Sequence, residues 1–296
     1  MILSIANSKI KLEVDTLGAQ MMTLTDSDGI QYLWEGDPKY WRKRAPNLFP
    51  FIGRLTENSY TYEGVIYPMG IHGFAAAQPF AVESHTENLL VLRLDSNEET
   101  LKQYPFRFSY LVHYRLVGES VEITYQVKNF TDKTMPFGVG GHPGFRVPMV
   151  EGEQFDDYEL VFSRKCLPDR VGFTPKVYLS GHDDRFPLQD GCRIALRHEL
   201  FDDDAIILKN MDREVKLLSK VSGRSITVTY PQMPYLGIWH MPKTDAPYVC
   251  IEPWSSLPAR QDVVEELTCK SDMVQLAPGG EYKNIWSITV AKGENA

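Results

Sequence analysis

The chain has 296 residues, with 31 Lys and Arg against 39 Asp and Glu, which gives a formal net charge of −8. The charges are scattered and no basic run is long enough to follow a phosphate backbone, so no nucleic-acid partner is expected. The amino terminus lacks the basic start and apolar core of a signal peptide, and no apolar run approaches the ~18 residues that span a bilayer. We therefore expect a cytoplasmic protein without a membrane partner, folded as a single domain over residues 1–296.

The first third of the chain has the pattern of short strands joined by turns. Apolar and polar residues alternate, as in half-buried strands, and strands are expected at residues 9–14, 20–25, 80–83 and 89–94. Residues 59–67 predict a hairpin that turns at Glu63-Gly64. Residues 38–44 (PKYWRKR) predict a single helical turn, and two prolines exclude helix from residues 45–54.

The clearest local pattern is a hairpin over residues 108–128 that turns at residues 118–120. Before it, residues 96–99 have the Ser-x-x-Glu pattern of a capped helix start, and Pro105 ends that helix. Further strands are expected at residues 158–162, 193–196, 205–208, 215–218, 225–230, 236–239, 248–251 and 285–290. Many short strands with almost no helical periodicity indicate an all-β sandwich with a few short helices.

His142 lies in a glycine-rich segment, MPFGVGGHPGFRVP, over residues 135–148. Glycine permits close approach of another group, and Pro143 favours an extended His142. We interpret the glycines as room for a ligand beside the imidazole. The alternative is a structural histidine bonded to a backbone carbonyl. His72 has a similar setting between Gly70 and Gly73, although a lone histidine near a hairpin would more often be structural.

Glu252 follows the apolar strand at residues 248–251, and Pro253 is expected to end that strand. Partial burial beside Trp254 would favour the protonated carboxyl group and suit it to acid or base catalysis. The alternative is a carboxylate that caps a turn or forms an ion pair with a nearby arginine such as Arg260. The four cysteines show no CxxC pair and no histidine at zinc-ligand spacing, so reduced thiols and no metal are expected.

Three further residues are candidates for binding a small polar molecule. Arg54 ends an apolar loop, and we expect its guanidinium to point inward rather than form a surface ion pair. Asp204 is the preferred candidate among three consecutive acids that precede an apolar strand, although a solvated turn is the usual role of such a run. Trp239 ends another strand and is either a face for a sugar ring or a core tryptophan.

Several classes of chemistry are not indicated by the sequence. There is no nucleophile motif, phosphate loop, dinucleotide fingerprint or HExxH, so no cofactor is expected. An acid and a base on two sides of a small polar molecule suit paired proton transfer.

These segments together resemble the aldose 1-epimerase (galactose mutarotase-like) superfamily, and more closely its LacX-like branch of small bacterial members. The resemblance is carried, in order, by residues 45–50 with Arg54, residues 70–74, residues 140–145, Asp204-Ala205, residues 236–239 and residues 250–254. It implies a β-supersandwich and an isomerase that interconverts the anomers of an aldohexose in carbohydrate metabolism.

The resemblance also implies roles for the candidate residues. Glu252 is the implied general base for the anomeric hydroxyl, and His142 the acid for the ring oxygen. His72 shares in orienting the ring oxygen, while Arg54 and Asp204 hold sugar hydroxyls.

Relatives that act on hexose 6-phosphates tend to carry an arginine after the His-Gly-Phe triplet, where this chain has Ala75-Ala76-Ala77. A neutral sugar is therefore expected, because a phosphate monoester requires a cationic partner. Two alternatives stay open. One is a hexose-6-phosphate 1-epimerase that takes its charge from Arg42, Lys43, Arg44 or Arg146, and the other is a non-catalytic sugar-binding or sensing protein. A monomer or homodimer is expected.

Overall fold

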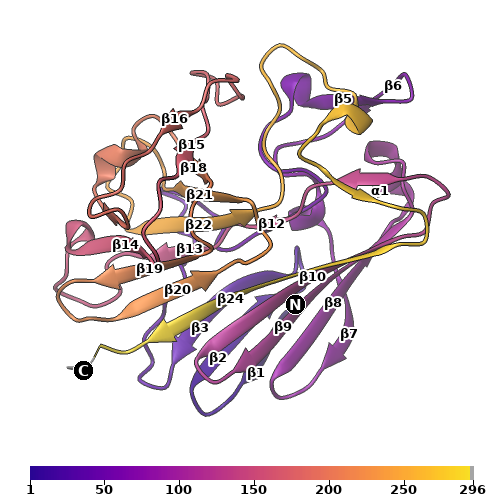
Figure 1. Ribbon diagram of the computed structural model, residues 1–296. Helices are drawn as coiled ribbons and strands as arrows, with labels where there is room; N and C mark the ends of the chain where they lie inside the picture. Colours follow the sequence, from indigo (N-terminus) through magenta and orange to yellow (C-terminus); the bar gives the residue numbers. More distant parts are fainter. Residues whose placement is uncertain (294–296) are drawn as a thin grey trace.

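The computed structural model describes residues 1–293, and β-strands dominate it (Figure 1). The largest sheet has nine antiparallel strands in the order β17-β14-β19-β20-β24-β10-β9-β8-β7. In chain order they are β7 (Ala81–His85), β8 (Leu89–Asp95), β9 (Phe108–Val117), β10 (Ser120–Asn129), β14 (Tyr158–Phe162), β17 (Arg193–Ala195), β19 (Glu214–Ser219), β20 (Ser225–Thr229) and β24 (Glu281–Ala291).

A second sheet has eight strands, seven of them in the order β16-β15-β18-β21-β22-β12-β4, while β13 also pairs with β22. They are β4 (Asn47–Leu48), β12 (Gly140–Gly141), β13 (Gly144–Arg146), β15 (Asp169–Arg170), β16 (Asp184–Arg185), β18 (Ile206–Lys209), β21 (Tyr235–Trp239) and β22 (Tyr248–Trp254). In Figure 1, β21 and β22 lie above β19 and β20 of the nine-stranded sheet.

Three small sheets and one α-helix complete the elements of residues 1–293. The small sheets are formed by β1 (Ile2–Ala6), β2 (Ile10–Asp15) and β3 (Gln20–Asp26), by β5 (Ser59–Tyr62) and β6 (Val65–Pro68), and by β11 (Met135–Phe137) and β23 (Val274–Leu276). The helix is α1 (Glu98–Gln103). Short 3-10 turns occur at Thr56–Asn58, Ala75–Ala77, Phe155–Asp157, His198–Phe201 and Leu267–Cys269.

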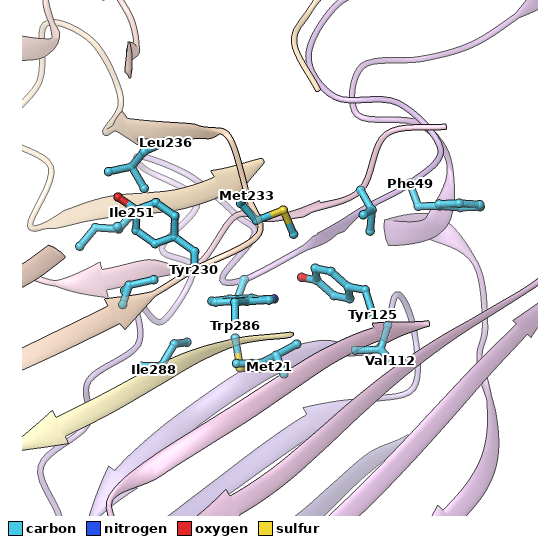
Figure 2. Packing of buried hydrophobic residues seen from close by; sticks show 14 of the residues in the cluster. Met21, Phe49, Val112, Tyr125, Tyr230, Met233, Leu236, Ile251, Trp286 and Ile288 are labelled. Atoms are coloured by element: carbon cyan, nitrogen blue, oxygen red, sulfur yellow. The ribbon is translucent and has the colours of Figure 1, made fainter. Parts of the chain in front are cut away.

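The main hydrophobic core lies between the two large sheets. Figure 2 shows Trp286 and Tyr125 of the nine-stranded sheet on one side and Leu236 and Ile251 of the eight-stranded sheet on the other. Along β24 the neighbour of Trp286, Ile285, is half exposed. This alternation buries one face of the strand and is the reason why its sequence predicted a half-buried strand.

The expected all-β sandwich is confirmed, and each expected strand is present within a few residues of its expected ends. The helix start is shifted: Asn97, not Ser96, accepts hydrogen bonds from the N–H groups of Glu99 and Thr100. The Ser96 hydroxyl instead accepts one from the N–H of Phe108. Of residues 38–44, only residues 38–40 form a turn, closed by bonds from the N–H groups of Tyr40 and Trp41 to the Asp37 carbonyl.

The expectation that Pro253 ends its strand is wrong, because β22 continues to Trp254. The N–H groups of Ile251 and Ser255 donate to the carbonyls of Pro143 and Val139, on the side of β12 and β13. Residues two apart in a strand point their N–H groups the same way, so Pro253 lacks a donor on that side only. Pairing with β21 continues on the other side.

Two expectations about composition can be compared with the structure. All four cysteines are free, as expected for reduced thiols. Within residues 1–293, no helix has the length and apolar character needed to cross a membrane.

Candidate active site

His142 lies in the break between β12 and β13, opposite Glu252 of the neighbouring strand β22. Gly144 pairs with Cys250 and Gly140 with Trp254, so the same register places His142 opposite Glu252. Directly opposite side chains project from the same face of a sheet and lie close together. The imidazole Nε2 is 3.2 Å from Oε2 of the carboxyl group.

Both members of this pair are buried, and burial acts on the two pKa values in opposite directions. The side chain of His142 is 10% exposed and that of Glu252 is 2% exposed. Burial raises the pKa of Glu252 well above its ordinary value, and the charge of Asp204 adds to this effect. Burial also lowers the pKa of His142 well below 6.5, with His72 adding to it. Since low polarity disfavours both ions, the resting pair is a neutral carboxylic acid beside a neutral imidazole.

The backbone and ring of His72 are fixed by two hydrogen bonds to one glycine. The His72 N–H donates to the Gly53 carbonyl at 3.0 Å, and the Gly53 N–H donates to Nδ1 of His72 at 3.1 Å. Because Nδ1 accepts, the ring proton of neutral His72 is on Nε2. Burial lowers the pKa of His72 to about 3, and Lys43 and Arg54 lower it further. His72 is therefore a neutral hydrogen-bond donor rather than an acid.

Aromatic rings surround the His142 imidazole. Trp41 stacks on it, with ring centroids 4.8 Å apart. Trp239 meets it edge-on at 5.7 Å, and His72 does so at 5.5 Å. These contacts hold the imidazole plane in place and exclude water from one of its faces.

These groups open onto one cavity of about 300 Å³, a size typical of small-molecule sites. All six residues expected at the site line it: Arg54, His72, His142, Asp204, Trp239 and Glu252. Of the three consecutive acids, Asp204 is the one in this lining, whereas Asp202 and Asp203 are exposed. The alternative partner of Glu252 is engaged elsewhere, since Arg260 bonds to Glu265 at 2.8 Å.

Gly237 lies opposite Glu252 on β21. A Cβ atom at Gly237 would lie 3.1 Å from Cβ of Glu252 and 3.2 Å from the Trp254 ring. A side chain at Gly237 would therefore crowd Glu252 and Trp254, which both line the cavity.

The interpretation that the glycines before His142 leave room for a ligand is wrong. A Cβ atom at Gly141 would lie 2.6 Å from the Trp286 ring, and one at Gly138 would lie 2.1 Å from the Ser256 hydroxyl. A Cβ at Gly140 would lie 2.8 Å from the Pro253 carbonyl oxygen. These glycines let the protein pack against itself below His142.

Sequence reasoning missed several residues of the lining. Trp41 is the main one. The feature of the sequence that could have indicated it is its position in the basic segment of residues 38–44, immediately before residues 45–54. Phe173 and Val177 come from a loop without a recognisable motif. Lys43 also lines the cavity, and among residues 1–293 neither Lys43 nor Arg54 has an acidic side chain within ion-pair distance (4.0 Å).

Comparisons with known proteins agree with one another. The family model described as aldose 1-epimerase matches residues 1–289. The chromosomal protein LacX of Lactococcus lactis subsp. lactis is 34% identical over 298 residues, which is 98% of this chain and 99% of that protein.

Two crystal structures are also similar over their full length. The galactose mutarotase related enzyme of Lactobacillus acidophilus is 35% identical with a TM-score of 0.95, over 100% of this chain and 99% of that one. A galactose mutarotase-like protein of Lactobacillus casei is 31% identical with a TM-score of 0.92, over 98% of this chain and 100% of that one. The fold is thus galactose mutarotase-like, which confirms the expected β-supersandwich.

Proposed function

The chain belongs to the aldose 1-epimerase family, and from this premise we propose that it interconverts the α and β anomers of an aldohexose. The observation that supports the proposal most directly is the pair of His142 and Glu252, with 3.2 Å between Nε2 and Oε2 at the surface of the cavity. A proton donor and a proton acceptor at this spacing can both reach the C1 hydroxyl and the ring oxygen of one pyranose.

The proposed reaction keeps the number of protons on the pair constant. Glu252 as carboxylate takes the proton of the C1 hydroxyl, while His142 as imidazolium gives a proton to the ring oxygen. The bond between C1 and the ring oxygen breaks, and C1 becomes an aldehyde. Rotation about the C1–C2 bond and the reverse proton transfers close the ring from the other face, giving the second anomer.

Burial of the pair bears on the protonation states that this reaction uses. The carboxylic acid and neutral imidazole that burial stabilises are the states of Glu252 and His142 after ring opening. The same low polarity disfavours the ionic pair with which the closed sugar reacts, so ring opening by this route starts from the minor, ionic form of the resting pair.

The remaining lining residues have positioning roles in the proposal. His72 carries its ring proton on Nε2 and can donate it to the ring oxygen or a neighbouring hydroxyl. Asp204 and Arg54 can bind hydroxyl groups, and Trp239 offers an apolar face for the sugar ring.

Polarimetry of freshly dissolved α-D-glucose and α-D-galactose tests the proposal. We expect Glu252→Gln and His142→Asn each to lower the enzymatic rate by about 10²- to 10⁴-fold, the usual contribution of a general acid or base. Glu265→Gln is the matched control, because Glu265 pairs with Arg260. A wild-type protein that binds sugar without accelerating anomer exchange in two-dimensional NMR would instead be a sugar-binding or sensing protein.

A second candidate, the same reaction on a hexose 6-phosphate, is favoured by Lys43 and Arg54. Both line the cavity, and within residues 1–293 no carboxylate lies within ion-pair distance of either. Unpaired cations in a substrate cavity favour an anionic group. The ratio of kcat/KM for glucose and glucose 6-phosphate distinguishes the candidates, and Lys43→Met with Arg54→Met should abolish any preference for the phosphate.

A further inference from the structure

Cys250 places a third potential metal ligand beside His142 and Glu252. It lies two residues before Glu252 on β22, so both side chains project from the same face of the strand. One ligand atom from each of the three residues lies within 4.8 Å of the other two. All three residues are buried, and Cys250 is fully so. The thiol therefore lies beneath the cavity surface that His142 and Glu252 form.

The geometry points to a binding site for a thiol-seeking divalent cation, Zn²⁺ or Cd²⁺, held by the Cys250 thiolate, the Glu252 carboxylate and a His142 ring nitrogen. Ligand atoms of a tetrahedral zinc site lie roughly 3.3–3.8 Å apart, given metal–ligand distances of about 2.0–2.3 Å. Starting from separations of up to 4.8 Å, the three side chains need to approach one another by at most about 1.0–1.5 Å. The fourth position then faces the cavity and is open to water.

Two of the proposed ligand residues carry a buried polar atom that forms no hydrogen bond. Nδ1 of His142 and Oε2 of Glu252 are buried without a hydrogen-bond partner in the part of the chain described, residues 1–293. Buried polar atoms in folded proteins are nearly always satisfied, so such atoms call for a partner. A cation between the three residues would bind the carboxyl oxygen directly.

The charges of the site balance on metal binding. The thiolate and the carboxylate together carry two negative charges, which neutralise the divalent cation inside a buried site. A thiol binds a metal as the thiolate, so metal binding displaces the thiol proton and the affinity should rise with pH.

The metal and the sugar should exclude each other. Both require His142 and Glu252, so Zn²⁺ should raise the apparent KM for the sugar without changing kcat. This consequence rests on the proposed function, whereas metal binding itself does not.

Titration of the metal-free protein with Cd²⁺ tests the site through the thiolate-to-metal charge-transfer absorption. We expect saturable binding with the band present. Cys250→Ser and Cys250→Ala should abolish the band and lower the affinity at least 10-fold. Glu252→Gln should keep the band and lower the affinity.

Cys269→Ser is the matched control, because Cys269 is an exposed thiol. It should leave the band and the affinity unchanged. A band that persists in both Cys250 variants, a band that disappears with Cys269→Ser, or no saturable binding would overturn the assignment. Since the readout is absorption, a protein without mutarotase activity that still binds Cd²⁺ through Cys250 would refute the proposed function but not this site.

Discussion

Replacing Gly141 by alanine should destabilise the protein, although the residue borders the candidate active site. The added Cβ would lie 2.6 and 2.9 Å from two carbons of the Trp286 ring and 3.1 Å from the Tyr125 hydroxyl. Trp286 is a fully buried core residue between the sheets (Figure 2), so neither ring can move away freely. Overpacking of this kind costs about 1–3 kcal/mol.

The expected net loss is smaller than this cost because alanine restricts the unfolded chain. Gly141 is not in the left-handed region, so Gly→Ala recovers about 0.4–1 kcal/mol of conformational entropy. We therefore expect Gly141→Ala to lower the free energy of unfolding by about 1–2 kcal/mol, with an unchanged denaturant slope. Gly70→Ala is the matched control, since a Cβ there meets nothing within 4 Å, and its stability should not fall.

Denaturant unfolding followed by tryptophan fluorescence gives these values, and a double mutant identifies the cause. In a Trp286→Leu background the clashing ring carbons are absent, so Gly141→Ala should cost at least about 0.5 kcal/mol less than in the wild type. Equal costs in the two backgrounds would refute the packing explanation. A stable Gly141→Ala protein with lost sugar binding would restore the interpretation that these glycines make room for a ligand.

Three further results are expected. Burial lowers the pKa of His240 to about 4. The contribution of His240 to stability is therefore complete above about pH 6.5 and is lost as the pH falls toward 4. His240→Gln should reduce by about one the number of protons taken up on unfolding at pH 5, which is measured from the slope of the free energy of unfolding against pH. Asn47→Ala should lower the free energy of unfolding by about 2–4 kcal/mol in thermal or denaturant unfolding. Asn47 bonds to two backbone carbonyls and to the Tyr125 hydroxyl, and the substitution would leave these groups buried without a partner. A loss below about 0.5 kcal/mol would contradict this explanation. Arg224→Met should lower the free energy of unfolding by about 3–5 kcal/mol in the same assay, because Asp26 would be left charged and buried without its partner. The double variant Arg224→Met with Asp26→Asn should recover part of this loss.

Local sequence patterns predicted the strands well because each strand has one buried face. The hairpin of β9 and β10 alternates over its whole length, and its partner strand follows after a short turn. Local pattern cannot predict which distant strands pair. The pairing of β11 with β23 joins segments far apart in the chain, and both strands are too short to show a period.

The candidate site was found from the sequence through residues with unusual neighbours. His72, His142 and Glu252 stand beside glycines or a proline, and all three line the cavity. Trp41 was missed because its role arises only when its turn folds over His142. The function of the glycines was misread for a similar reason, since the Trp286 ring that excludes a side chain there belongs to a distant strand.

In the proposed function, the opposed positions of His142 and Glu252 separate proton transfer from the choice of sugar. The distance between the two backbones is set by the spacing of paired strands, which hardly varies among sheets. Other lining residues, such as Arg54, Asp204 and Val177, come from loops and strand ends. Insertions or substitutions in those segments would therefore change which sugar the proposed enzyme accepts while leaving the spacing of His142 and Glu252 as it is.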